Sequence, residues 1–107
     1  MTSNTTPALS PAPPPTVRIV VPEHVVYRTF PTETVVLNLT TGRYHGLNTT
    51  AGRMLEALEQ VGSIRQAARV VADSFRKPQE IVERDMRELC RVLIERGLVE
   101  IDEHSGR

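Results

Sequence analysis

TVVLNLTTGRYHGLN, residues 34–48, is the stretch that decides the fold of this chain. Its first six residues are mostly apolar or β-branched, a composition typical of a strand. Thr40, Thr41 and Gly42 then break the run, and Gly42 supplies the positive φ that a hairpin turn needs. Residues 43–47 return as the partner strand. The stretch therefore predicts a β-hairpin that stops at Asn48, where the apolar period changes from two to 3.6 residues.

Two further apolar runs precede this hairpin. Residues 17–21 end at Pro22, and residues 25–30 end at Pro31, so both are candidates for short strands. We expect the first half of the domain to be a small antiparallel sheet with three strands.

The first 16 residues differ in composition from the rest of the chain. They carry no charge and hold five of the eight prolines, which are Pro7, Pro11, Pro13, Pro14 and Pro15. Such a segment buries too little apolar surface to offset the entropy lost on ordering it. We predict that residues 1–16 are a disordered tail with polyproline II character, either an inert leader or a proline-motif ligand for a partner.

Two helical patterns follow the hairpin. Asn48 or Thr49 is expected to cap the first helix, and Gly62 ends it. Ser63 and Gln66 have the spacing of a capping box, in which each side chain satisfies an unpaired amide at the start of the second helix.

A third helical pattern begins at Pro78, which suits the first position of a helix, and ends at Gly97. Residues 98–101 can add a short closing strand. This order of elements predicts one α+β domain over residues 17–101, a winged helix-turn-helix. Its three-stranded antiparallel sheet is followed by three helices and a short C-terminal strand. Residues 102–107 are expected to be a flexible tail.

The composition narrows the possible functions. Lys plus Arg and Asp plus Glu are both 13 in 107 residues, so the chain lacks the basic excess usual in nucleic-acid-binding proteins. Cys90 is the only cysteine, which excludes an intrachain disulfide and favours the reducing cytoplasm. No apolar run approaches the roughly 18 residues of a membrane span. The N-terminus does not have the pattern of a secretory signal.

Catalytic and metal-binding patterns are weak in this sequence. His24, His45 and His104 have no ligand partners at a metal-binding spacing, so we expect no metal and no cofactor. Cys90 lies among apolar residues of the third helix, which favours a buried structural thiol over a nucleophile. We expect no catalytic residues and no enzymatic activity of this chain alone.

Two motifs carry a family resemblance. They are Gly42-Arg43-Tyr44-x-Gly46-Leu47-Asn48 and Asp85-x-x-x-Leu89-x-x-x-Leu93-x-x-x-Gly97-Leu98. Their order and spacing, over about residues 25–101, resemble the PqqD-like recognition elements of ribosomally made, modified peptides (RiPPs). The first motif looks most like the small stand-alone members from lasso peptide pathways.

This resemblance implies a winged helix-turn-helix that binds the leader segment of a precursor peptide without catalysis. In the lasso branch such proteins deliver the precursor to a separate leader peptidase, and a cyclase then closes the ring. In the pyrroloquinoline quinone branch they present the peptide to a radical SAM enzyme. The resemblance also implies β-augmentation, in which the leader pairs with the exposed edge of residues 43–47 beside the third helix.

We expect the peptide-binding residues on these two elements. They are Arg43, Tyr44, His45, Gly46 and Leu47 from the strand, and Val82, Asp85, Met86, Leu89 and Leu93 from the helix. Gly46 would give close access to the backbone, while core packing is the alternative for the apolar helix residues.

Three roles stay open at this point. Tyr44 either stacks on the leader or fills the core face of the sheet. Arg43 either pairs with an acidic leader residue or is a solvated surface charge. Asp85 either accepts a donor from the leader or pairs with an arginine such as Arg43 or Arg96.

The competing functions are a PqqD-type peptide chaperone for a radical SAM enzyme, a DNA-binding winged-helix regulator and a dimerisation module. Residues 78–97 hold five acidic residues against four arginines. A helix that reads the major groove is normally enriched in basic residues, so DNA binding is disfavoured.

Overall fold

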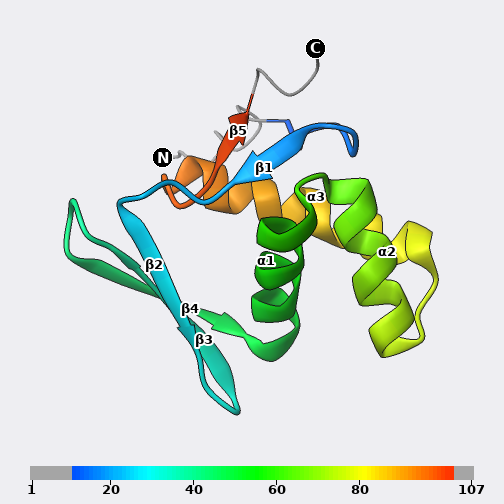
Figure 1. Cartoon of the computed structure of the whole chain (residues 1–107), viewed down its shortest axis with the longest axis horizontal. Coiled ribbons are helices and arrows are strands. Elements are labelled where there is room, and N and C mark those ends of the chain that lie inside the picture. Colours follow the sequence, from blue (N-terminus) through cyan, green and yellow to red (C-terminus); the bar gives the residue numbers. More distant parts are fainter. Residues whose placement is uncertain (1–10, 103–107) are drawn as a thin grey trace, which may run out of the picture.

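The computed structural model describes residues 11–102, and these form three helices and two antiparallel sheets (Figure 1). The elements follow the chain in the order β1 (Arg18–Val20), β2 (Val25–Thr29), β3 (Glu33–Asn38), β4 (Arg43–Asn48), α1 (Thr49–Val61), α2 (Ile64–Phe75), α3 (Gln79–Glu95) and β5 (Glu100–Asp102). The predicted α+β class is confirmed.

Strands β2, β3 and β4 form the three-stranded sheet, in sequence order and antiparallel throughout. The hairpin predicted over residues 34–48 is its β3–β4 half. Asn38 stabilises the turn because its Oδ1 accepts the amides of Thr40 and Thr41 at 2.9 and 3.2 Å. Gly42 completes the turn at a φ of 75°, a left-handed value that favours glycine.

Helix α1 packs on one face of this sheet (Figure 1). Asn48 caps it, because the Asn48 Oδ1 accepts the amide of Ala51 at 2.8 Å. The helix and β3 meet closely at Gly52, where an added Cβ would stand 2.1 Å from the Oγ1 of Thr34. Thr34 is 1% exposed, so nothing larger than glycine fits here without displacing the helix.

Two side-chain hydrogen bonds join β2 to α1. The hydroxyl of Tyr27 donates to Glu59, and the hydroxyl of Thr29 donates to Glu56 at 2.9 Å. Burial, followed by the bond to Glu59, raises the pKa of Tyr27, so this hydroxyl keeps its proton at neutral pH. The sheet is thereby held against the helix along its β2 border.

Gly62 ends α1 at a φ of 94°, and Ser63 then caps α2. The Ser63 Oγ accepts the amide of Gln66 at 3.1 Å, as the capping box predicts. The reciprocal contact differs, because the Gln66 side chain meets the Ser63 hydroxyl at 3.0 Å. Pro78 has an extended ψ of 134°, so it is the N-cap of α3 and not its predicted first residue.

The helices and both sheets share one core. Its largest buried side chains come from β1, from β3, from all three helices and from the segment after α3, and they include Ile19, Leu55, Leu58, Ile64, Met86, Leu93 and Leu98. Leucine, isoleucine and methionine thus supply the buried volume in a chain with few aromatic residues.

Strands β1 and β5 form a separate two-stranded sheet, so the run at residues 17–21 does not join the three-stranded sheet. On its other side β1 meets the turn between α1 and α2, where the amide of Ile19 donates to the carbonyl of Gly62 at 2.8 Å. The closing strand begins at Glu100, later than predicted, because Leu98 and Val99 are buried in the core.

Residues 11–16, which the sequence assigns to a tail, lie against the helices. The carbonyl of Pro13 accepts the Nε of Arg87 at 2.8 Å, and Pro13 itself is buried. The carbonyl of Pro15 accepts the amide of Arg65 at 2.9 Å, which satisfies a donor in the first turn of α2. These contacts extend the packed unit beyond the predicted boundary at residue 17.

The remaining predicted tail residues, 1–10 and 103–107, lie outside the described residues. Within residues 11–102, no helix has both the length and the apolar character that crossing a membrane requires.

Candidate functional site

Strand β4 lies at the border of its sheet, with β3 on one side and no strand of residues 11–102 on the other. The amide of Phe30 donates to the carbonyl of Glu33, so alternate residues of β3 starting at Glu33 turn their backbone groups toward β2. The residues between them bond to β4. Tyr44 and Gly46 of β4 pair with β3 residues whose backbone groups face β2. The amides and carbonyls of Tyr44 and Gly46 therefore point away from the sheet.

Helix α3 runs antiparallel to β4. Two surface hollows are each lined by residues from both elements. One hollow links Asn48, at the end of β4, to the middle of α3. The other links Arg43, at the start of β4, to Arg96, directly after α3. An extended strand covers about 17 Å from Arg43 to Asn48, and a helix covers about 17 Å from Asp85 to Arg96. We call the space between the two elements the β4–α3 groove.

The hollow at the end of β4, called the apolar hollow below, is lined by Asn48, Thr50, Ala51, Met54, Asp85, Glu88, Leu89 and Val92. Leu89 and Val92 are half-buried and supply its apolar surface from α3. Burying one such side chain of a ligand is worth about 1.5–3 kcal/mol. This hollow therefore suits an apolar side chain.

Two exposed carboxylates border the apolar hollow. Asp85 forms an ion pair with the neighbouring Arg84 at 3.6 Å, and not with either arginine suggested by the sequence. Arg91 donates to Glu88, and this hydrogen bond lowers the pKa of the Glu88 carboxyl. Glu88 is therefore ionised at neutral pH. Both carboxylates at this border have an arginine partner.

The hollow at the start of β4, called the basic hollow below, is lined by Asn38, Thr41, Arg43, His45, Glu95 and Arg96. None of the ion pairs within residues 11–102 includes Arg43, His45 or Arg96. Its only carboxylate, Glu95, already accepts the Nη1 of Arg91 at 2.9 Å. The basic hollow thus keeps an uncompensated positive charge.

Eight of the ten predicted site residues fall into two groups. Arg43, His45, Asp85 and Leu89 line the two hollows. Leu47, Val82, Met86 and Leu93 are instead buried in the core, with 8, 3, 0 and 0% of their surface exposed. A peptide in the groove cannot reach these four side chains without opening the core, so we leave them out of the site.

Tyr44 does not fill the core face of the sheet, which was one of its two predicted roles. Its side chain is 71% exposed and lies on the outer face of the sheet with Val26, Phe30 and Leu37. Arg43 and His45 alternate with Tyr44 and lie toward α3, as the strand period predicts. Tyr44 therefore offers the groove its backbone groups and not its ring.

Gly46 is not required by the packing of the chain itself. An added Cβ would contact Glu33 Oε1 at 3.4 Å, an ordinary contact on the outer face. Its role in access for a peptide stays a prediction.

Sequence reasoning missed several residues of the groove. Val92 and Glu88 line the apolar hollow, and Glu95 and Arg96 line the basic hollow. A signal for them exists, because Asp85, Glu88, Leu89 and Val92 follow the spacing i, i+3, i+4, i+7 and share one helix face. That face lies beside the buried face of α3, and the two were merged in the sequence prediction.

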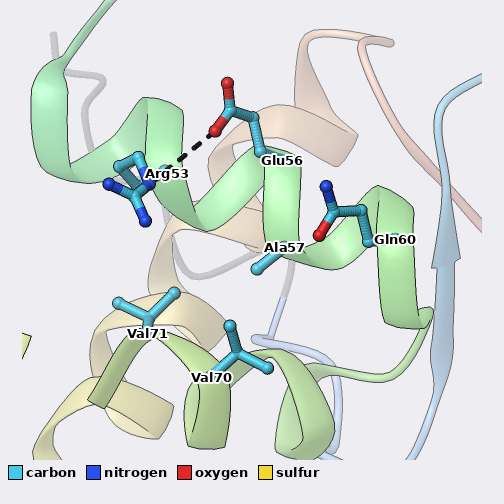
Figure 2. A pocket seen from close by; sticks show the side chains of 6 residues that line it. All are labelled: Arg53, Glu56, Ala57, Gln60, Val70 and Val71. Atoms are coloured by element: carbon cyan, nitrogen blue, oxygen red, sulfur yellow. Dashed lines mark ion pairs between the residues drawn. The ribbon is translucent and has the colours of Figure 1, made fainter. Parts of the chain in front are cut away.

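A further hollow lies between α1 and α2, away from β4 (Figure 2). Arg53, Glu56, Ala57 and Gln60 border it from α1, and two valines border it from α2 (Figure 2). Arg53 pairs with Glu56 at 3.7 Å and also donates to Ser74 at 3.3 Å. Because its charged groups already pair with each other, we do not treat this hollow as the candidate site.

Groups that could support catalysis are scarce in the described part of the chain. Burial raises the pKa of the Cys90 thiol to about 12, so the thiol stays protonated and unreactive at neutral pH. Residues 11–102 contain no group of three or more His, Cys, Asp and Glu side chains arranged to hold a metal ion. The groove can therefore provide a ligand with hydrogen bonds, apolar contacts and charged side chains.

The family model for coenzyme PQQ synthesis protein D (PqqD) matches residues 33–99. The chain belongs to the PqqD family. The matched residues run from β3 to the end of the core segment after α3, so they include both walls of the groove. This match confirms the resemblance to PqqD-like recognition elements that the two motifs indicated.

Two solved structures resemble this PqqD family member. TbiB1 in complex with the TbiA(beta) leader peptide is 29% identical with a TM-score of 0.68, and the match covers 75% of this chain and 93% of that chain. Lasso peptide synthetase B1 complexed with the leader peptide is 22% identical with a TM-score of 0.68, and the match covers 78% and 98%. The second likeness bears on the fold alone. Among curated protein sequences, none matches the chain.

Proposed function

We propose that this chain recognises the leader segment of a ribosomally made precursor peptide by adding the leader as a further strand to β4. The observation that carries the proposal is the outward direction of the Tyr44 and Gly46 backbone groups beside α3. A β-strand edge of this kind pairs readily with an extended peptide. The leader complex of the 29% identical TbiB1 supports the same task for this chain.

Backbone pairing alone does not supply the affinity. Ordering one residue of a flexible leader costs about 1–2 kcal/mol, and one backbone hydrogen bond returns about 0.5–1.5 kcal/mol. The surplus must come from side chains of the leader, each worth about 1.5–3 kcal/mol when fully buried. In this proposal the apolar hollow at Leu89 and Val92 supplies that burial.

We place this recognition step in lasso peptide biosynthesis, in the cytoplasm where the precursor is made. The chain acts without catalysis and delivers the precursor to a separate leader peptidase and then to the cyclase. We keep the winged helix-turn-helix interpretation, with α2 and α3 as the helix pair. The protonated, buried Cys90 thiol supports a non-catalytic role, because a nucleophilic cysteine needs a lowered pKa.

A second candidate is a peptide chaperone for a radical SAM enzyme, and the PqqD family match favours it. Both candidates use the same groove and differ in the enzyme that receives the peptide. If the lasso assignment is right, a leader peptidase is encoded beside this chain, and adding the chain to that purified peptidase should accelerate precursor cleavage. Acceleration of a radical SAM enzyme, without any effect on a peptidase, would favour the second candidate.

Leader binding is tested by fluorescence polarisation. The fluorescein-labelled leader of the precursor encoded beside this chain is titrated with the full chain, and a scrambled leader serves as the control. We expect saturable, submicromolar binding that unlabelled leader reverses and that the scrambled peptide lacks. A folded chain that binds both peptides equally weakly would refute the proposal.

A further inference from the structure

The two ends of the β4–α3 groove differ in how their charged side chains are paired. At the basic hollow, Arg43 and Arg96 have no ion-pair partner within residues 11–102, and Arg91 holds the one nearby carboxylate. At the apolar hollow, the charged lining residues are Asp85 and Glu88, and each is paired with an arginine of α3. The chain as a whole is neutral, so the unpaired positive charge is a local property of the basic hollow.

The groove also constrains the spacing between two side chains of a bound peptide. Along α3, Leu89 and Val92 lie about 6–11 Å from Arg96, while β4 covers about 17 Å from Arg43 to Asn48. An extended peptide covers these distances in about two to five residues. Both hollows are on the α3 side of the strand, and side chains of an extended peptide that point to one side are separated by an even number of residues. The even separations within this range are about two and about four residues.

Resting on the leader-binding function above, we propose that the bound peptide places an acidic side chain against Arg43 and Arg96. This acidic residue stands roughly two or four positions from an apolar residue held by Leu89 and Val92. A carboxylate between two unpaired guanidinium groups gains charge-assisted hydrogen bonds. A basic residue at the same place would be repelled by both arginines, so the hollow favours a negatively charged side chain.

The test uses a displayed library of random dodecapeptides, selected in parallel on the full chain and on the double variant Arg43→Glu/Arg96→Glu. On the wild type we expect enrichment of an acidic residue at one of the two even separations from an apolar residue. On the double variant we expect a basic residue at the same position. Both substituted residues are exposed, and thermal melts of the two proteins establish that the variant is folded.

The matched control is Arg69→Glu, which reverses the charge of an exposed arginine on α2, away from the groove. It should select the same peptides as the wild type. Equal acidic enrichment on the wild type and the double variant, or apolar enrichment with no acidic position, would overturn the charge selection and leave leader binding standing. Failure of the folded wild type to enrich any peptide would instead overturn both proposals.

A synthetic peptide recovered from the wild-type selection gives a second, quantitative readout. Replacing its acidic residue by the amide should weaken binding about two- to fivefold, as expected for one exposed ion pair. The same replacement should have no effect on binding to Arg43→Gln/Arg96→Gln. If the loss were equal on both proteins, the acidic residue would not lie at the basic hollow.

Discussion

Strands β1 and β4 are both short, yet their surroundings differ. β1 has a partner on each side, with β5 along one edge and the Gly62 carbonyl on the other, and its Ile19 is 2% exposed. Among residues 11–102, β4 has a partner strand on one side alone, and Tyr44 and Gly46 turn backbone groups outward. The two strands therefore have different roles. A strand enclosed on both edges stabilises the core, while a strand with one unpaired edge beside a groove is available for binding.

The largest effect, a loss of unfolding free energy, is expected from substitutions in β1. Ile19→Pro removes the amide that donates to Gly62, together with the buried side chain. Ile19→Ala, the control, removes the side chain and keeps the amide. We expect the alanine variant to lose about 2–5 kcal/mol of unfolding free energy. The proline variant should lose at least about 1–3 kcal/mol more. Urea unfolding followed by circular dichroism measures both, and equal stability of the two variants would contradict the enclosed role of β1.

The next effect concerns the groove beside the unpaired edge. Leu89→Asp places a charge in the apolar hollow, and Ile81→Asp makes the same change at an α3 position that is 43% exposed and outside both hollows. Losing one buried apolar contact of about 1.5–3 kcal/mol predicts leader binding weakened roughly 10- to 100-fold by the first variant. Ile81→Asp should bind normally. Fluorescence polarisation measures both, and equal losses would place the peptide elsewhere.

A smaller effect tests the unpaired edge itself. Tyr44→Pro removes an amide that points away from β3, so the hairpin keeps its bonds. One lost hydrogen bond of about 0.5–1.5 kcal/mol predicts leader binding weakened roughly two- to tenfold. Tyr44→Ala, which keeps the amide, should bind like the wild type because the ring lies on the outer face.

His45→Pro is the counterpart within the same strand. The amide of His45 faces β3, so its loss should lower the melting temperature of the chain more than Tyr44→Pro does. Thermal unfolding by circular dichroism compares the two. The reverse order of stabilities would mean that the assigned direction of the β4 amides is wrong.

The smallest effect is expected at Gly46. A methyl group here would make an ordinary contact with Glu33 on the outer face. Gly46→Ala should therefore change leader affinity less than about twofold and leave stability nearly unchanged. A large loss of affinity, measured in the same titration, would show that the peptide approaches β4 from the outer face.

Local chemistry made much of the fold predictable. The hairpin over residues 34–48 follows from β-branched residues, a turn glycine and the Asn48 cap, all within one short stretch. The stop at Gly62 and the start at Ser63 also depend on neighbours in sequence. Partners of β1 were not predictable, because β5 lies some 80 residues away and its pairing depends on how the helices pack.

The candidate site was predictable only in part, for a related physical reason. The strand period correctly separates Arg43 and His45 from Tyr44. On α3, the core face and the groove face lie side by side, so periodicity alone does not distinguish Met86, which is buried, from Leu89, which lines the groove. That distinction requires the positions of α1 and β4 against the helix, which are tertiary information.

Amide hydrogen exchange, measured residue by residue by NMR with and without saturating leader peptide, tests the central claim most directly. We predict that the Tyr44 and Gly46 amides exchange at least about tenfold more slowly in the complex, since both gain a backbone acceptor. The Tyr27 and Thr29 amides, which face outward at the opposite border of the sheet, should be unchanged. Unchanged exchange at Tyr44 and Gly46 in the saturated complex, or slowing confined to Tyr27 and Thr29, would contradict the account.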